Sequence, residues 1–539
     1  MDNNRSAIKS RIWILVFMSA TFLSIPFLVP HCGFFALFAL VPLFFIDKIC
    51  YDNNIKHTWW YYFTAFFLFN LAATFWIYYV SPIGSVAALL LNTLQMSVIF
   101  ALFRWSKKRV KGILPYLFFI ATWLAWEHVY YEIEISWPWL VLGNSFAASV
   151  KLVQWYDITG VLGGTLWILL SNVLLYFVII NLKGSKPAGK YQKRGRYALL
   201  STFAIVLVVP MVYSLFKYYG YKEKGDSVEV VVVQPNINPF TEKFGKVSQR
   251  VQDNKLLSLV DKVITPDTRY IFTPETFTYR LDLDYPEGNG TYMAFKDYIN
   301  KHPKVNFVFG ALAYKNFYTS IKPSVTARSV GEYWYEVYNS AIFIDKDDIY
   351  QYYHKSKLVP GVERIPYQKQ LTFLGDIFAK FGGAQDSYAT QKELSIMRGN
   401  DGNNFGVMIC YESIYGDYSR EAVDLGANFM AVMTNDGWWG DTPGYRQHFR
   451  FASLRAIEMR RDIVHATNTG TSGFINQRGD ILQKTDWWVP VAIKENVHLN
   501  SEKTIFVKYG DVIGRVSSFL FCLLMLSLIG ISFIYKRKR

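Results

Sequence analysis

The chain has 539 residues, of which 51% are hydrophobic and 18% aromatic, and it carries a formal net charge of +15. This composition is more apolar than a soluble protein of this length requires, so it indicates membrane segments joined to globular sequence. Much of the positive charge lies in short loops between apolar segments. That placement gives the charge a topological role and argues against nucleic-acid binding.

Eight apolar segments come close to the length of about 20 residues that a helix needs to cross the hydrocarbon. They cover approximately residues 11–30, 33–46, 58–80, 83–103, 112–130, 158–181, 197–217 and 516–535, the second being the shortest. The first is followed by more membrane sequence and by no clear cleavage site, so we expect an uncleaved helix. We therefore expect a membrane domain at 1–220, a globular domain at 221–510, and a C-terminal span with a basic tail at 511–539.

Basic residues cluster after alternate spans. The clusters are Arg5, Lys9 and Arg11; Lys48 and Lys56; Arg104, Lys107, Lys108, Arg109 and Lys111; Lys183, Lys186, Lys190, Lys193, Arg194 and Arg196; and Lys536, Arg537, Lys538 and Arg539. The positive-inside rule then places both termini in the cytoplasm, with Lys217, Lys222 and Lys224 as a minor exception. We expect a multi-pass protein of the bacterial inner membrane whose globular domain lies in the periplasm.

The globular domain alternates strand and helix patterns. Strands are expected at 228–235, 270–274, 305–310, 340–344, 349–353, 404–409 and 429–434, and helices at 247–263, 291–302 and 446–461. This alternation predicts an α/β domain, in which polar residues gather where strands end and loops begin.

Cys410 follows one of these strands and is the only cysteine of the globular domain, since Cys32, Cys50 and Cys522 lie in or beside spans. No disulfide can therefore form within that domain. Its position is that of a nucleophile, although a small buried apolar residue is the equal alternative. We find no CxxC motif and no His/Cys cluster at metal spacing, so we expect neither a metal nor a cofactor.

Two further reactive residues follow strands, namely Glu275 and Lys355. Taken singly, each could be an ordinary solvated loop residue. Together with Cys410 they supply what thiol catalysis needs. A carboxylate can take the thiol proton and return it, and an ammonium can stabilise both the thiolate and a tetrahedral oxyanion.

The motifs around these residues carry a resemblance. They are Thr273-Pro274-Glu275, Lys355-Ser356-Lys357-Leu358-Val359-Pro360 with Glu363, and Cys410-Tyr411-Glu412, joined by Asn435-Asp436-Gly437-Trp438-Trp439-Gly440, Arg455-Ala456-Ile457-Glu458 and Asn468-Thr469-Gly470. The first three resemble the Glu-Lys-Cys motifs of the nitrilase (carbon-nitrogen hydrolase) superfamily. The whole set, with the flanking spans, resembles the apolipoprotein N-acyltransferase family over nearly the entire chain.

The resemblance implies a nitrilase-like αββα sandwich carried on about eight membrane helices. It assigns Glu275 as general base, Lys355 as stabilising cation and Cys410 as acyl-accepting nucleophile, with Glu363, Tyr411 and Glu412 in supporting positions. The sequence departs from the family pattern at two points. Phe244 stands where the family has a tryptophan, and Gly361-Val362-Glu363 replaces the usual Phe-Gly-Glu.

The resemblance also implies a reaction in two halves. Cys410 takes an acyl chain from the sn-1 ester of a phospholipid, typically phosphatidylethanolamine, and the resulting thioester acylates the α-amino group of a diacylglyceryl-cysteine on an apolipoprotein. The expected partners are thus a phospholipid donor, a diacylglyceryl apolipoprotein and the bilayer.

Substrate contacts are expected from Phe244, Trp438 and Trp439. An apolar stretch formed by Phe373, Leu374, Ile377, Phe378 and Phe381 is a candidate gate for lipid, with ordinary core packing as the alternative. Two other functions stay open. One is a membrane-tethered carbon-nitrogen hydrolase (amidase) that uses water as acceptor. The other is a transporter, against which the spans carry few charges beyond Glu127.

Overall fold

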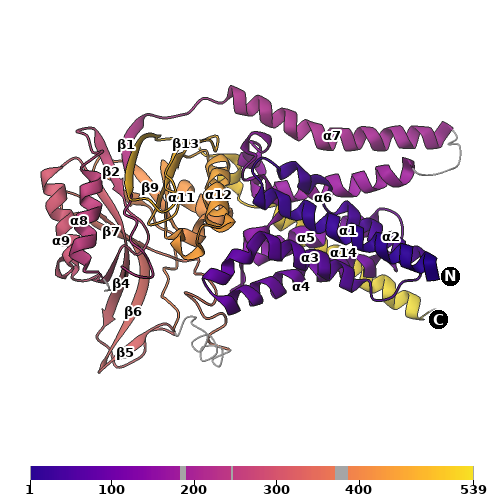
Figure 1. The fold of residues 1–539 in the computed structure, drawn as a ribbon, viewed down its shortest axis with the longest axis horizontal. Coiled ribbons are helices and arrows are strands. Elements are labelled where there is room, and N and C mark those ends of the chain that lie inside the picture. Colours follow the sequence, from indigo (N-terminus) through magenta and orange to yellow (C-terminus); the bar gives the residue numbers. More distant parts are fainter. Residues whose placement is uncertain (1, 183–189, 244–246, 371–385, 538–539) are drawn as a thin grey trace. The chain divides into compact units, whose positions relative to one another are not determined.

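The computed structural model describes residues 2–182, 190–243, 247–370 and 386–537. The chain divides into two compact units, which Figure 1 shows in the colours of the sequence. The membrane unit comprises Met1–Tyr78, Pro82–Gly220 and Tyr509–Arg539, and the globular unit comprises Tyr79–Ser81 and Tyr221–Lys508.

Two sheets form the globular unit. The first contains β1 (Ser227–Gln234), β2 (Thr268–Phe272), β3 (Thr278–Asp282), β4 (Asn306–Phe317), β5 (Arg328–Val330), β6 (Tyr333–Ile344), β7 (Tyr350–His354) and β14 (Val491–His498), in the order β14-β1-β2-β4-β6-β5, with β3 paired to β4 and β7 to β6. The second contains β8 (Met397–Arg398), β9 (Asn404–Ile409), β10 (Phe429–Thr434), β11 (Ile463–Thr467), β12 (Gly473–Ile475) and β13 (Ile481–Lys484), in the order β13-β12-β11-β10-β9-β8.

Four layers result from the side-chain alternation of these strands. Val230 and Val232 of β1 point into a core shared with Val407 and Ile409 of β9, so the two sheets pack face to face. Val231, the residue between the two, faces α8 (Gln249–Val260) and α9 (Gly290–Lys301) on the other side. The outer face of the second sheet packs on α11 (Gly416–Asp424) and α12 (Pro443–Met459). Because both faces of each sheet are covered, the strands read as continuous apolar runs. The expected αββα sandwich is confirmed.

Parallel strands direct several loops to the same edge of this sandwich. β1, β2 and β4 run parallel, and β7 runs the same way because β4–β6 and β6–β7 are both antiparallel. In the second sheet β9, β10 and β11 are parallel. The loops after β2 and β7 therefore leave from one end of the first sheet, which is where such folds place their polar groups.

Eight long helices make up the described part of the membrane unit. They are α1 (Asp2–Leu28), α2 (Val41–Asp52), α3 (Trp59–Thr74), α4 (Pro82–Lys107), α5 (Leu114–Tyr130), α6 (Tyr156–Leu182), α7 (Lys190–Gly220) and α14 (Val512–Arg537). A 3-10 turn, Gly33–Phe38, leads into α2, so the second expected span reaches Asp52 instead of ending near residue 46. Seven of the spans are long and apolar enough to cross a membrane, while α5 has only 17 residues. The protein is a multi-pass membrane protein.

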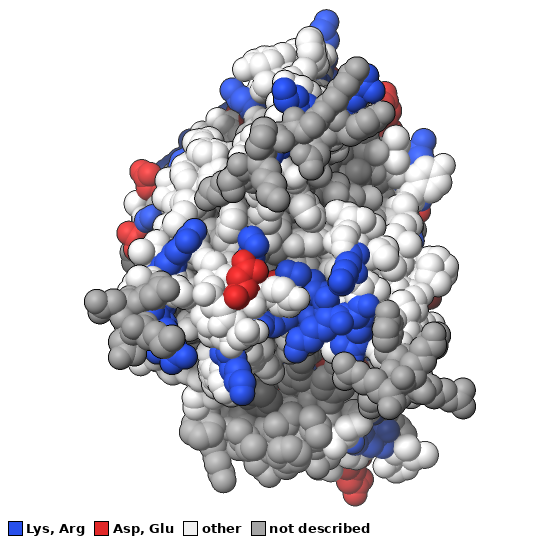
Figure 2. Space-filling view, turned by 90° about the vertical axis from the view of Figure 1, so that its right-hand side faces the viewer, with Lys and Arg blue, Asp and Glu red and all other residues white. Residues whose placement is uncertain are grey.

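The first and last helices belong to one bundle. α1 packs on α3, α3 packs on α4, α4 packs on α5, and α14 packs along α5. Both chain termini lie at the same end of the membrane unit (Figure 1). On the face of the molecule that carries this end, Lys and Arg side chains gather and few acidic side chains are visible (Figure 2). Arg104 and Lys107 in the last turn of α4 belong to the basic helix ends of this unit.

The membrane unit buries more acidic groups than the expected Glu127. Asp47 in α2 is 2% exposed and forms an ion pair with Lys107, and the Tyr62 hydroxyl donates to it at 3.3 Å. Asp157 at the start of α6 pairs with Lys217 of α7 at 2.6 Å. Both carboxylates lie near helix ends, where a lysine from another helix can neutralise them, which is how charges are tolerated at membrane depth.

Glu127 in α5 forms no ion pair with a cation in the described part of the chain and is held by hydrogen-bond donors. Its Oε1 accepts from the Trp123 indole at 2.9 Å and from the Leu142 backbone N–H at 3.0 Å, and its Oε2 accepts from the Thr165 hydroxyl at 2.6 Å. These bonds join α5 and α6 to the 3-10 turns that connect them, since Thr165 also accepts from Gly143 N–H.

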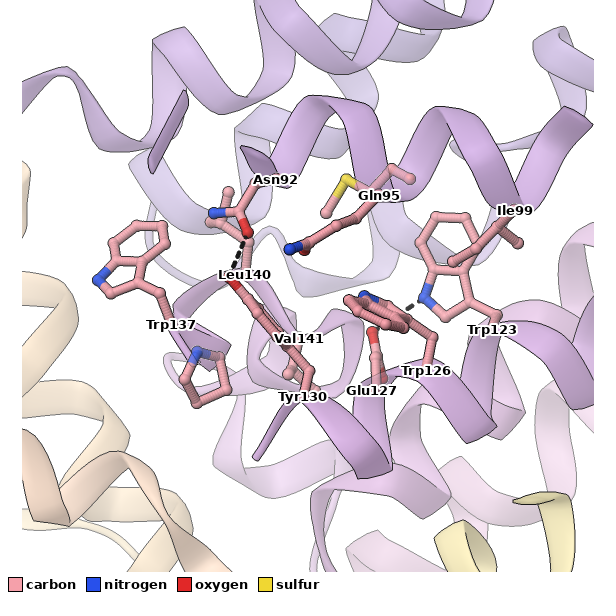
Figure 3. A pocket seen from close by; sticks show the side chains of 12 residues that line it. Asn92, Gln95, Ile99, Trp123, Trp126, Glu127, Tyr130, Trp137, Leu140 and Val141 are labelled. Atoms are coloured by element: carbon pink, nitrogen blue, oxygen red, sulfur yellow. Dashed lines mark hydrogen bonds between the residues drawn. The ribbon is translucent and has the colours of Figure 1, made fainter. Parts of the chain in front are cut away.

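A cavity of about 30 Å³ lies beside Glu127 (Figure 3), which is space for one or two waters. Its walls include Asn92, Gln95, Trp126, Tyr130 and Trp137, and the Tyr130 hydroxyl donates to Asn92 across it at 2.7 Å. The carboxylate and its hydrogen-bond donors form a buried polar cluster beside this cavity, whose wall is mostly apolar.

We expect Glu127→Leu to lower the thermal unfolding temperature of the detergent-solubilised protein by several degrees. The substitution leaves three buried donors without an acceptor, each at a cost of roughly 1–3 kcal/mol. Glu127→Gln, which keeps one carbonyl oxygen, should lose much less. Equal unfolding temperatures for Glu127→Leu and the wild type would contradict this account.

Candidate active site

Cys410 stands directly after β9 and opens a 3-10 turn, Cys410–Ile414. Its φ of +52° lies in the left-handed region, which is costly for a residue with a Cβ. The conformation turns the chain sharply at the end of a buried strand, and the thiol side chain is only partly buried there. Such a strained turn is typical of residues whose exposure is functional.

Glu275 follows β2 in a similarly strained segment. The next residue, Thr276, has a φ of +46°, which is unusual for a β-branched residue. Gly310 of β4 makes this path possible, because a Cβ there would lie 2.3 Å from the Pro274 carbonyl oxygen and 2.7 Å from the Glu275 Cα. The glycine therefore fixes how closely the Glu275 loop approaches the sheet.

Lys355 follows β7 and lies between two carboxylates. Its side chain is 1% exposed, with Nζ 3.0 Å from Glu275 Oε1 and 2.9 Å from Glu363 Oε1. Burial alone would lower the pKa of this ammonium, but Glu275 and Glu363 outweigh burial and raise the pKa well above its usual value. Lys355 is therefore a fixed cation over the ordinary pH range.

Asn339 of β6 is an active-site neighbour that the sequence analysis missed. Its Nδ2 donates to Glu275 Oε1 at 2.7 Å and to Glu363 Oε1 at 3.1 Å, and its backbone carbonyl accepts from the Lys355 backbone N–H at 2.8 Å. A buried Asn-Ser pair inside an apolar strand was the available signal. Because all these contacts use Oε1, the residues that the structure describes give Glu275 Oε2 no hydrogen bond, and this oxygen remains able to accept a proton.

The Cys410 thiol is poised by opposing influences. Burial raises its pKa well above the usual value, the Glu275 carboxylate raises it further, and the Lys355 ammonium lowers it. The resting thiol is therefore protonated near neutral pH. A base must remove the proton during attack, and the Glu275 carboxylate, whose charge acts on the thiol, is the candidate.

Glu412 links the two sheets beneath the site. It is fully buried, its Oε1 accepts from the Tyr353 hydroxyl and from Ser356 N–H, both at 2.7 Å, and its Oε2 accepts from Ile409 N–H at 2.8 Å. Burial raises the pKa of this carboxyl, and these hydrogen bonds counteract the rise. Glu412 thus ties the loop of Lys355 to the turn of Cys410. Tyr411, the residue between, is buried and packs edge-to-face on Tyr415.

Lys243 supports the Glu275 loop and was also missed. Its Nζ donates to the Thr276 hydroxyl at 3.1 Å and to the Glu275 carbonyl at 3.4 Å. Burial lowers the pKa of Lys243 to about 8, and the Glu275 charge partly opposes that shift. The neighbouring Phe244, expected as an aromatic wall, lies outside the described residues, as does the expected apolar gate from Phe373 to Phe381.

Trp438 and Trp439 lie in a short 3-10 helix after β10, Asp436–Trp439. The Trp438 ring packs edge-to-face on Phe240, whose side chain is 51% exposed. Trp439 packs edge-to-face on His448 of α12. The two tryptophans therefore face different surroundings, one an exposed aromatic surface and the other a buried histidine.

Two groups of carboxylates and histidines come within metal-ligand distance in the described chain, Asp436–His448–His465 and Glu223–Asp462–His498. Sequence spacing did not reveal them, because their members come from separate elements. In each group a histidine already pairs with an aspartate, His448 with Asp436 and His498 with Asp462, both at 3.1 Å.

We expect Lys355→Met to slow alkylation of Cys410 by iodoacetamide at pH 8 about 10- to 100-fold, because loss of a nearby cation raises a thiol pKa by roughly one to two units. The measurement uses a chain whose Cys32, Cys50 and Cys522 are replaced by serine. Lys357→Met is the matched control, since this lysine lies over the Tyr415 ring. An unchanged rate in Lys355→Met would show that the ammonium does not act on the thiol.

Comparison with known proteins identifies the family. The carbon-nitrogen hydrolase family model matches residues 229–500, about half of the chain, and the model of the apolipoprotein N-acyltransferase N-terminal domain matches residues 19–174. An apolipoprotein N-acyltransferase from Chlorobaculum tepidum is 27% identical over 95% of both chains, and one from Geobacter metallireducens is 25% identical over 81% of this chain and 78% of that one. A solved nitrilase-superfamily structure from Saccharomyces cerevisiae has a TM-score of 0.35 at 14% identity, covering 51% of this chain and 90% of that one. The chain therefore belongs to the carbon-nitrogen hydrolase family, and within it to the apolipoprotein N-acyltransferases.

Proposed function

We propose that this acyltransferase carries the acyl group as a thioester on Cys410, with Glu275 as general base and Lys355 as the cation that stabilises the oxyanion. The observation that carries the proposal is the buried Lys355 ammonium held between Glu275 and Glu363, close enough to Cys410 to lower the pKa of its thiol. A site built only for stability would gain little from such an arrangement, because burying three charges is costly.

In the first half-reaction Glu275 takes the thiol proton and Cys410 Sγ attacks the ester carbonyl of a phospholipid. Negative charge develops on the carbonyl oxygen, and Lys355, being a permanent cation, stabilises it without reorganisation. When the intermediate collapses, the carbon–oxygen bond of the ester breaks and Glu275 returns the proton to the leaving lysophospholipid. The acyl chain remains on the sulfur.

In the second half-reaction the α-amino group of a diacylglyceryl-cysteine attacks the thioester. The amine must be neutral, and with a reference pKa of about 8 it is mostly protonated at pH 7. We infer that Glu275 removes the proton lost by the amine and returns it to the Cys410 thiolate as the amide forms. The same carboxylate thus acts twice.

Lipid substrates also require an apolar approach to the site. Phe240 is half-exposed and Trp438 packs on it, so this aromatic surface is our candidate for contact with acyl chains or headgroups. The basic end of the membrane unit, where both termini lie, supports an orientation with that end in the cytoplasm and the globular unit on the periplasmic side of an inner membrane (Figure 2).

We expect the purified protein, after incubation with phospholipid vesicles, to gain the mass of one acyl chain, and we expect Cys410→Ala to gain none. Cys522→Ala, which removes an exposed cysteine of the membrane unit, is the control and should be acylated normally. Addition of a diacylglyceryl peptide should discharge the adduct into a triacylated product. Discharge only to free fatty acid would favour a membrane-tethered amidase, and an adduct on Cys410→Ala would refute the nucleophile.

We expect Glu275→Gln to break down the thioester with an amine roughly 10²- to 10⁴-fold more slowly at pH 7. The deficit should shrink toward pH 9, where most of the amine is already neutral. The thioester is loaded from a p-nitrophenyl ester, whose good leaving group needs less help, and Glu287→Gln on the surface serves as control. Identical pH profiles for Glu275→Gln and the wild type would argue against a second role for this carboxylate.

A further inference from the structure

A fully buried histidine lies on the side of Cys410 that belongs to the second sheet. His448 of α12 has its Nε2 3.0 Å from the Cys410 carbonyl oxygen and 2.9 Å from the Ser413 hydroxyl. Its Nδ1 is 3.1 Å from Asp436 Oδ1. The imidazole thus bridges the turn of the nucleophile and the carboxylate that follows β10.

The protonation state of His448 follows from its neighbours. The Cys410 carbonyl can only accept, so the hydrogen bond at 3.0 Å requires Nε2 to donate to it. The Ser413 hydroxyl donates its own proton to the same carbonyl at 2.9 Å, so it also acts as an acceptor toward Nε2. Nδ1 faces a carboxylate and must donate as well. A ring that donates from both nitrogens is an imidazolium.

The surroundings support a charged pair at Asp436 and His448. The Thr434 hydroxyl donates to Asp436 Oδ1 at 2.7 Å, which stabilises the ionised carboxylate. Burial would lower the pKa of His448, but Asp436 outweighs burial and raises it. His465, whose ring lies 5.8 Å away, is neutral because burial lowers its pKa to about 3.

Several other charged groups around α12 are paired with one another, while Arg450 lies partly buried beside Arg446 and Tyr445. Arg455 pairs with Glu458 at 2.6 Å, and Arg420 of α11 pairs with Asp417 at 2.7 Å. Glu275 contributes to the raised pKa of His448, and its charge is shared with Lys355. The elements packed against α12 thus leave Asp436 as the principal counter-ion of His448.

We propose that His448 is a positioning residue that, as an imidazolium, holds the strained turn of Cys410 and cancels the Asp436 charge behind the nucleophile. The inference rests on the proposed role of Cys410 as the acyl carrier. The Asp436 charge adds to burial and to Glu275 in raising the pKa of the Cys410 thiol. Without His448, that carboxylate would oppose formation of the thiolate during attack.

The test measures the pH dependence of Cys410 alkylation by iodoacetamide in the chain without its three other cysteines. His448→Gln keeps an amide donor for the Cys410 carbonyl but removes the positive charge. The midpoint of the curve of alkylation rate against pH should therefore move up by about one pH unit, and alkylation at a fixed pH below the midpoint should be about tenfold slower. Adding Asp436→Asn should reverse most of that shift, because the uncompensated carboxylate is then gone. His465→Gln, a neutral member of the same cluster, should leave the midpoint in place.

A purely structural histidine would give no shift in His448→Gln, or a shift that Asp436→Asn does not reverse, and either result overturns the proposal. If His448→Gln does not fold, ¹⁵N spectra of the histidine side chains show whether His448 is protonated. These spectra are recorded at pH 8 on a chain that keeps His448 and carries His128→Gln and His498→Gln. One buried imidazolium should remain, and its absence would refute the inference. Alkylation needs no lipid, so these outcomes are separate from those of the acyl-adduct experiment, which tests Cys410 as the carrier.

Discussion

The site depends on one buried ammonium shared by two carboxylates. Lys355 Nζ lies about 3 Å from both Glu275 and Glu363, and Asn339 donates to the same two carboxylate oxygens. Burying a charge is expensive unless it is paired and hydrogen-bonded. Here pairing makes the cation permanent, so a positive charge faces the thiol at every ordinary pH. The packed sheets of the αββα sandwich hold these three side chains in place, and the stability of the sandwich offsets the cost of burying them.

Backbone strain gathers at the same place. Cys410 and Thr276 both have positive φ, and Gly310 lets the Glu275 loop approach β4 more closely than any side chain would permit. Such conformations persist only where the surroundings over-determine them. Glu412 and His448 supply that support at the start of the turn, the first by accepting from backbone N–H groups of both sheets and the second by donating to the Cys410 carbonyl. Hydrogen bonds from both sheets thus hold the turn of the nucleophile.

The membrane unit also pairs or hydrogen-bonds its buried carboxylates, but with different partners. Asp47 and Asp157 are neutralised by lysines from neighbouring helices, whereas Glu127 is satisfied by three donors and borders a small cavity with a mostly apolar wall. In hydrocarbon no water is at hand to satisfy a stranded donor or acceptor. These carboxylates therefore stabilise the arrangement of α2, α4, α5, α6 and α7.

The sequence alone determined the apolar spans, the α/β alternation and seven of the strands in the described structure, while β3, β5, β8 and β11 to β14 were not expected. The expected strands at 404–409 and 429–434 coincide with β9 and β10, because buried parallel strands read as unbroken apolar runs. It also pointed to Glu275, Lys355 and Cys410, since reactive residues after strands are a local signal. Only the tertiary structure brought in Asn339, which is 64 residues from Glu275, and His448, which is 38 residues from Cys410. Their roles come from hydrogen bonds between distant segments, and no local pattern records which buried polar group will meet which partner.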